Sequence, residues 1–141
     1  MTDQPLFSSL ELRPQLLNQL QHLGFIAMTP IQAAALPHVL TGADVVAQAS
    51  TGSGKTAAFG LGCLQHLQET KFHVQSLVLC PTRELADQVA NSFRSLAKNL
   101  ANTKIVTLCG GVAIGPQIGS LQHSAHIIVG TPGRVLKHLH K

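Results

Sequence analysis

The stretch GADVVAQASTGSGKT, residues 42–56, decides the fold class. Its first half contains an apolar run at residues 44–49, which is typical of a buried strand. Its second half, from Ala49 to Thr56, fits the phosphate-loop pattern A/G-x-x-x-x-G-K-[ST], the Walker A motif. The glycines of that pattern let the backbone wrap around phosphate oxygens, and its N–H groups point at the anion from a helix N-terminus. The sequence therefore predicts an α/β domain with a phosphate loop between a strand and a helix.

Two side chains of this loop carry chemistry. Lys55 would place a positive charge on the β- and γ-phosphates of a nucleotide, and the Thr56 hydroxyl would ligate Mg²⁺. Both are candidate catalytic residues. The alternative is a glycine-rich turn that binds nothing, which leaves the single cation of a long apolar stretch unexplained. The residues predicted to hold the phosphates are Ser50, Thr51, Gly52, Ser53, Gly54, Lys55 and Thr56.

Apolar runs alternate with helical patterns along the rest of the chain, as in parallel α/β folds. Further strands are expected at residues 74–80, 104–108 and 126–129. Helices are expected at residues 14–24, 30–42, 54–69, 82–98, 117–122 and from 131 to the end, with Leu85, Val89, Phe93 and Leu96 on one face of the fourth. The last helix is expected to be still running at Lys141. We therefore expect one domain over residues 1–141 that is incomplete at its C-terminus.

The composition restricts the protein class but not the function. Apolar residues make up 45% of the chain, which favours a packed core, and the net charge of +4 is mildly favourable for a polyanion. Cys80 and Cys109 each end an apolar run, which predicts buried thiols in a reducing compartment. His123 and His126 lack nearby cysteines or carboxylates, so no zinc-type site is predicted. We expect a soluble, cytoplasmic protein without a membrane span, because no apolar run approaches about 18 residues.

A second motif lies upstream of the phosphate loop, where residues 24–32 read GFIAMTPIQ. The Gln32 amide can pair with N6 and N7 of adenine, where guanine presents an oxygen and would be rejected. The alternative is a helix cap at Thr29 followed by an ordinary exposed glutamine.

These two segments together resemble the Q motif and motif I of the DEAD-box ATP-dependent RNA helicases. In that family an isolated aromatic residue precedes the Q-motif glycine by 17 positions, and Phe7 stands at that place. The resemblance implies a RecA-like P-loop domain with a mostly parallel sheet, ATP and Mg²⁺ as cofactors, and a Phe7 ring that stacks on adenine. The ATP contacts that it implies upstream of the phosphate loop are Phe7, Gly24, Phe25, Thr29, Pro30 and Gln32.

Three later loops resemble the RNA-binding motifs Ia, GG and Ib of the same family. Each follows an expected strand, and the carboxyl ends of parallel strands meet at one edge of a sheet. Hydroxyls, arginines and glycines suit contacts with RNA phosphates rather than bases. The residues predicted to bind RNA are Pro81, Thr82 and Arg83, then Gly110 and Gly111, and finally Thr131, Pro132, Gly133 and Arg134.

The longer strings around these motifs resemble a bacterial branch of the family that acts in large-subunit ribosome assembly. This implies ribosomal RNA as the partner and a monomeric full-length protein. The family's Asp-Glu-Ala-Asp does not occur, and none of the six acidic residues follows Asp87. We therefore expect this chain alone to bind ATP and RNA without hydrolysing ATP. Two alternatives stay open: another P-loop enzyme, such as a small-molecule kinase, and a non-catalytic fragment that binds nucleotide, RNA or a partner.

Overall fold

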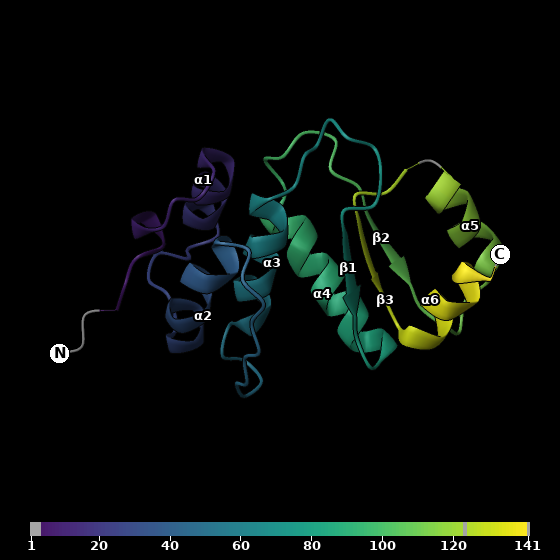
Figure 1. Ribbon diagram of the computed structural model, residues 1–141, viewed down its shortest axis with the longest axis horizontal. Coiled ribbons are helices and arrows are strands. Elements are labelled where there is room, and N and C mark those ends of the chain that lie inside the picture. Colours follow the sequence, from purple (N-terminus) through teal and green to yellow (C-terminus); the bar gives the residue numbers. More distant parts are fainter. Residues whose placement is uncertain (1–3, 123, 141) are drawn as a thin grey trace. The chain divides into compact units, whose positions relative to one another are not determined.

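The computed structural model describes residues 4–122 and 124–140, which form two compact units (Figure 1). The first unit consists of the chain up to His66 together with Ser95–Leu100. The second consists of Leu67–Arg94 and the chain from Ala101 onward. None of the helices in these described ranges combines the length and apolarity needed to cross a membrane.

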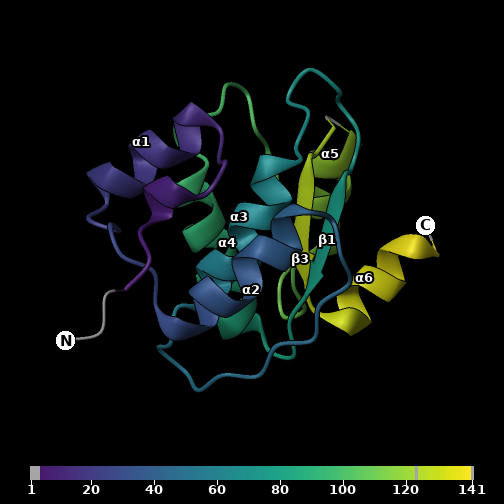
Figure 2. The same cartoon turned by 60° about the vertical axis from the view of Figure 1, so that its left-hand side comes forward.

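The first unit is helical. It contains a short 3₁₀ turn, η1 (Phe7–Ser9), and the helices α1 (Pro14–His22), α2 (Pro30–Leu40) and α3 (Lys55–Gln65) (Figure 2). Helices α2 and α3 pack closely, because Gly62 leaves room for Val39: a Cβ on residue 62 would overlap the valine side chain. The core of this unit is built mainly from leucines, namely Leu12, Leu16, Leu20, Leu36, Leu61 and Leu64.

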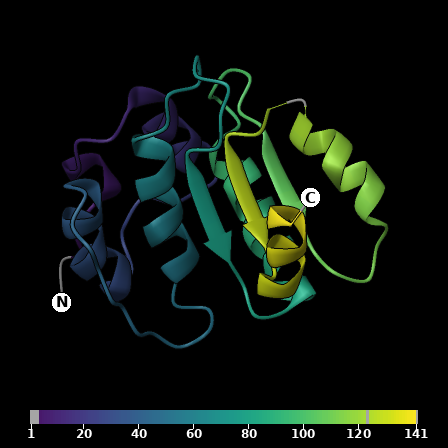
Figure 3. The same ribbon diagram turned by 45° about the vertical axis from the view of Figure 1, so that its right-hand side comes forward.

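The second unit is a parallel sheet with helices on both faces. Its strands β1 (Ser76–Leu79), β2 (Ile105–Leu108) and β3 (Ile127–Gly130) lie in the order β1-β3-β2. In Figure 3, α4 (Arg83–Leu96) lies behind this sheet and α6 (Pro132–Leu139) in front of it, while α5 (Ile114–Gln122) packs beside β2. The central strand β3 is the most buried, and its Ile127 and Val129 side chains are inaccessible to solvent.

Most of the expected helices and strands are confirmed, and most of them are a few residues shorter than predicted. The three later strands and the helices at 14–24, 30–42, 54–69 and 82–98 are all present. The helix expected at 117–122 begins earlier, at Ile114. The last helix ends at Leu139, so the expectation that it runs on is wrong within the described residues. Leu85 is half exposed and does not share the buried face of Val89, Phe93 and Leu96.

The strand predicted at residues 44–49 is wrong. Residues 43–50 have no regular structure, and the Val46 side chain is fully exposed. A strand needs a neighbour for its backbone N–H and C=O groups, and the described strands pair only with each other. The apolar sequence of this segment is therefore not matched by burial.

Candidate functional site

The phosphate loop has the local shape that the motif predicts. Gly52 and Gly54 have φ values of 83° and 87°, in the left-handed region that favours glycine. The loop turns through these residues into α3, whose first residue is Lys55. The Lys55 ammonium is exposed and donates to the Ala49 carbonyl at 3.0 Å, across the mouth of the loop. Thr56 follows in the first turn of α3, where its hydroxyl would ligate Mg²⁺.

Gln32 connects the start of α2 to this loop. Its Oε1 accepts from the Thr29 backbone N–H at 2.9 Å, and its Nε2 donates to the Gly54 carbonyl at 3.0 Å. The side chain is only 4% exposed. The Gln32 side chain thus caps the Thr29 N–H at the start of α2, and the glutamine is buried rather than exposed. Each amide atom keeps capacity for one more hydrogen bond, so the adenine contact stays a prediction.

An open cleft of about 530 Å³ lies between α2 and the phosphate loop in the first unit. Its lining comprises Thr29, Pro30, Ile31, Ala34, Gln48, Ala49, Ser50 and Ser53. Two buried hydroxyl oxygens, Thr29 Oγ1 and Ser53 Oγ, have no hydrogen-bond partner among the described residues. Because buried polar atoms are nearly always hydrogen-bonded, these two oxygens fit a polar ligand such as a nucleotide.

The two upstream aromatic residues lie away from that lining. Phe7 is buried, and its backbone N–H donates to the Ile26 carbonyl at 3.0 Å. Phe25 is 45% exposed. Both border a separate cavity of about 250 Å³ with Leu17 and Leu20. In this conformation the Phe7 ring presents little surface to a base, so its stacking on adenine stays a prediction that requires the ring to be uncovered.

The three loops predicted to meet RNA share one edge of the sheet in the second unit. The strands are parallel, so their carboxyl ends lie together. Two backbone hydrogen bonds join these ends: Cys80 N–H donates to the Gly130 carbonyl at 2.9 Å, and Thr131 N–H donates to the Leu108 carbonyl at 3.0 Å. Residues 81–83, 110–111 and 131–134 follow directly, which confirms the predicted common edge.

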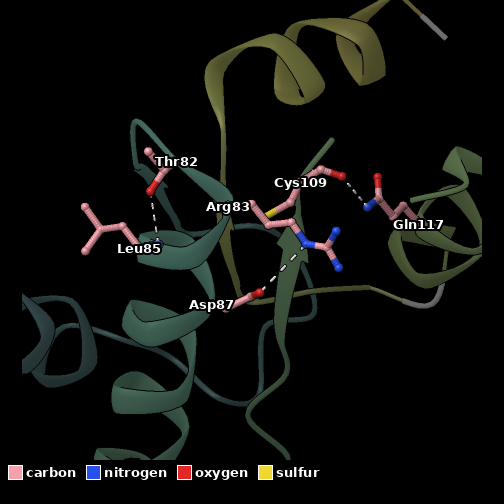
Figure 4. Close-up of polar contacts among 6 residues, drawn as sticks. All are labelled: Thr82, Arg83, Leu85, Asp87, Cys109 and Gln117. Atoms are coloured by element: carbon pink, nitrogen blue, oxygen red, sulfur yellow. Dashed lines mark hydrogen bonds and ion pairs between the residues drawn. The ribbon is translucent and has the colours of Figure 1, made fainter. Parts of the chain in front are cut away.

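The first of these loops begins helix α4 (Figure 4). Thr82 Oγ1 accepts from the Leu85 N–H at 3.2 Å, as an N-terminal helix cap does. The Arg83 Nε lies 4.0 Å from Asp87 Oδ2, and both side chains are half exposed. A Cβ on Gly111 would lie 3.3 Å from Arg83 Nη1, so the diglycine loop runs beside this guanidinium.

The second and third loops form a cationic cleft of about 570 Å³. It is lined by Gly110, Thr131, Gly133, Arg134, Leu136, Lys137 and His140. Arg134 is therefore brought together with both the diglycine loop and the start of α6. Guanidinium, ammonium, hydroxyl and accessible backbone are the groups that contact phosphates in nucleic-acid complexes.

Sequence reasoning missed the role of Gln117, which it placed only at the start of a helix. Its Nε2 donates to the Cys109 carbonyl at 3.1 Å, immediately before the diglycine loop. Its Oε1 accepts from Arg134 Nη1 at 3.1 Å and from His138 Nε2 at 2.9 Å. Arg134 and His138 stand four positions apart, on one face of a helix, but no sequence pattern links this pair to Gln117.

Burial sets the protonation states around this edge. It raises the pKa of the Cys80 thiol, and the nearby Cys109 raises it further. Burial also raises the pKa of Cys109, and Asp87 adds to this while Arg83 and Arg134 oppose it. Both thiols therefore stay protonated near neutral pH and are poor nucleophiles. Burial, followed by the charge of Arg134, lowers the pKa of His138, which is thus neutral near pH 7.

His126 has a structural role. It is completely buried, with Nδ1 accepting from the Lys104 N–H at 3.0 Å and Nε2 at 3.0 Å from the Glu69 carbonyl. Both ring nitrogens are thus engaged. His123, the other member of the pair considered above, lies outside the described residues.

The chain matches the family model of the DEAD/DEAH box helicases over residues 29–141. It is 62% identical over 136 residues to the ATP-dependent RNA helicase DbpA of Escherichia coli K12, a match that covers 96% of this chain and 30% of that protein. It is 45% identical to the ATP-dependent RNA helicase DeaD of Haemophilus influenzae, with all of this chain and 23% of DeaD covered. The chain thus spans less than a third of the length of these relatives.

Solved structures give the same result for the fold. A DEAD box protein from Methanococcus jannaschii superposes with a TM-score of 0.89 at 43% identity, over 96% of this chain and 37% of that one. Saccharomyces cerevisiae Dbp5 bound to RNA and ADP BeF3 superposes with a TM-score of 0.85 at 31% identity, over 96% of this chain and 34% of that one. The fold is thus the RecA-like α/β fold, and the chain belongs to the DEAD/DEAH box helicase family.

Proposed function

We propose that this chain provides ATP-binding and single-stranded-RNA-binding surfaces of an ATP-dependent RNA helicase that locally unwinds RNA duplexes. The observation that carries the proposal is the meeting of three phosphate-suited loops at one edge of the parallel sheet, with Arg83 and Arg134 among them. Two relatives that match along nearly the whole chain are named ATP-dependent RNA helicases. A structural neighbour was solved with RNA and ADP BeF3.

Each surface has a defined task in this proposal. Gln32 reads the adenine edge, the glycine-rich loop and Lys55 hold the phosphates, and Thr56 ligates Mg²⁺, which neutralises phosphate charge when bound. Arg83 and Arg134 hold successive phosphates of one RNA strand. ATP binding then favours closure of the complete helicase on RNA, and hydrolysis releases the RNA.

The RNA in this proposal is ribosomal, and the process is large-subunit assembly in the cytoplasm by a monomeric protein. The support is the similarity of the strings around the motifs to one bacterial branch of the family. The family match removes the support for a small-molecule kinase. A non-catalytic binding chain remains the second candidate, because no acidic residue follows Asp87 in the sequence.

The test is a chimera in which this chain replaces the matching 136 residues of E. coli DbpA. We expect ATPase activity that rises with added ribosomal RNA, and strand separation of a short duplex. Lys55→Ala in the chimera should abolish both, since it removes the phosphate-binding cation. ATPase activity that ignores RNA would contradict the helicase proposal.

Removing the Gln32 amide should weaken ATP binding. We expect Gln32→Ala in the 141-residue chain to lower the affinity for ATP by about 1–3 kcal/mol, the value of a bidentate base contact. Isothermal titration calorimetry measures this, with the exposed Gln15→Ala as the matched control. Thermal unfolding should show a separate loss of about 1 kcal/mol from the helix cap. Equal affinity of the unmutated chain for ATP and GTP would show that Gln32 does not read adenine.

The two arginines should hold phosphates without reading sequence. We expect Arg83→Ala and Arg134→Ala each to weaken binding of all single-stranded RNAs alike. The slope of log affinity against log salt should fall by about 0.7 for each lost contact. Fluorescence anisotropy with labelled oligouridylate and a mixed-sequence RNA tests this, with the exposed Lys71→Ala as control. A loss confined to one RNA sequence would argue for base contacts instead.

A further inference from the structure

The buried amide of Gln117 is the best-connected polar group at the RNA-facing edge that the proposed function leaves without a task. It comes from α5, whereas its three partners belong to the segment just before Gly110 and to helix α6, the two parts of the chain that line the cationic cleft. One is the Cys109 carbonyl at the end of β2, and two are side chains of α6. The Gln117 residue is 9% exposed, its contact with Cys109 is buried, and its contacts with Arg134 and His138 are partly buried.

The chemistry of the partners fixes the orientation of this amide. A guanidinium donates and cannot accept, so the atom that faces Arg134 must be Oε1. A carbonyl accepts and cannot donate, so the atom that faces Cys109 must be Nε2. His138 then has to carry a proton on Nε2 to donate to the same oxygen. Both lone pairs of Oε1 are used, and one orientation of the amide satisfies all three contacts.

The consequence concerns Arg134. Arginine has long, rotatable side-chain bonds, and holding it in one geometry costs conformational entropy. Gln117 accepts a hydrogen bond from Nη1 of Arg134. Arg134 itself lines the cationic cleft together with Gly110 and Thr131. The same amide fixes the carbonyl that precedes Gly110. The diglycine loop and the motif Ib arginine thus share one anchor.

We propose that Gln117 is a positioning residue: its amide holds the Arg134 guanidinium and the Cys109 carbonyl in register, so that the loops 110–111 and 131–134 form one preorganised phosphate cradle. This proposal rests on the proposed RNA-binding function. His138 is the third member of the anchor, and its neutrality near pH 7 keeps a second positive charge away from Arg134.

A double-mutant cycle in the 141-residue chain tests the proposal. Gln117→Met keeps the length and volume of the side chain and removes its hydrogen bonds. We expect it to weaken binding of oligouridylate about tenfold, on the scale of a hydrogen bond to a charged group. In an Arg134→Ala background the further loss should be much smaller, because only the hold on the Cys109 carbonyl is then removed. Gln122→Met, exposed at the end of the same helix, is the matched control and should change nothing.

Two outcomes of the cycle overturn the proposal. An equal loss from Gln117→Met with and without Arg134 would show a general structural role. No loss from Gln117→Met, when Arg134→Ala and Arg83→Ala both weaken RNA binding, would show that the amide does not position the arginine. If neither arginine variant weakens RNA binding, the proposed function itself fails, which is a distinguishable result.

A second measurement does not depend on RNA or on the Met variant folding. Nuclear magnetic resonance of the His138 ring should show the Nε2–H tautomer at neutral pH in the unmutated chain. Gln117→Glu places a carboxylate against that N–H and should raise the pKa of His138, since an opposite charge favours the protonated ring. An unchanged pKa would show that residue 117 does not contact His138, and the anchor would be refuted.

Discussion

The 141-residue chain is expected to release no phosphate from ATP above the uncatalysed rate, with or without RNA. Phosphoryl transfer needs a positioned water, a metal held by carboxylates and charge stabilisation on the γ-phosphate. The strand ends of the described sheet carry no carboxylate: β1, β2 and β3 are followed by Cys80, Cys109 and Thr131. Lys55 and Thr56 provide only part of the electrostatics.

Asp87, the last acidic residue of the sequence, cannot fill the carboxylate role. It lies on α4 beside Arg83, half exposed, rather than at the end of a strand. The DEAD-box resemblance also implies arginine fingers that a further domain supplies, and such residues are worth about 10³–10⁵ in rate in related NTPases. Phosphate release should be measured with Lys55→Ala as the background control and the DbpA chimera as the positive control. RNA-stimulated turnover by the chain alone would refute this expectation.

The segment before the phosphate loop is unpaired within the described part of this chain. Residues 43–50 are irregular, and Val45 and Val46 are exposed although apolar. The resemblance to the DEAD-box family implies that this segment is a strand. Its neighbours in that family are strands that come later in the chain than the phosphate loop. Unpaired backbone and exposed valines make such a segment an aggregation hazard. Amide exchange should be fast at residues 45–47 in a monomer, and strong protection there would show that the segment is paired after all.

The sequence predicted the order and type of the elements because local patterns encode them. The alternation of apolar runs and helical periodicity located β1, β2 and β3, and Thr29-Pro30 located the start of α2. The strand at 44–49 failed for a physical reason: an apolar run specifies burial, but only neighbouring strands can provide it. Periodicity also could not show that Leu85, in the first turn of α4, stays half exposed.

The candidate sites were predictable where a motif carries backbone chemistry. The left-handed Gly52 and Gly54, the cap at Thr82 and the common edge of three loops all follow from residue types and strand order. Side-chain partners across long separations were not predictable. The link from Gln32 to Gly54 spans 22 positions, and that from Gln117 to Arg134 spans 17. Glutamine has no pattern that reveals such a partner before the fold is known.

Gly130 is a position where even one added methyl group should cost considerable stability. It ends the central strand β3, between β1 and β2. A Cβ there would lie 2.6 Å from the Leu108 carbonyl oxygen and 2.7 Å from Val135 Cγ2. The Leu108 carbonyl oxygen belongs to the backbone of β2 and also accepts the hydrogen bond from the Thr131 N–H. This oxygen therefore cannot move without disturbing the sheet edge.

We therefore expect Gly130→Ala to lower the free energy of unfolding by about 3 kcal/mol, at the upper end of overpacking costs in a packed core. The matched control is Gly119→Ala, because a Cβ on this residue of α5 meets no atom within 4 Å. Alanine stabilises a helix interior relative to glycine by about 1 kcal/mol, so the control should raise stability. Urea unfolding followed by circular dichroism measures both variants. The same added methyl group should thus act with opposite signs at the two positions, and equal effects would mean that Gly130 is not closely packed between β2 and α6.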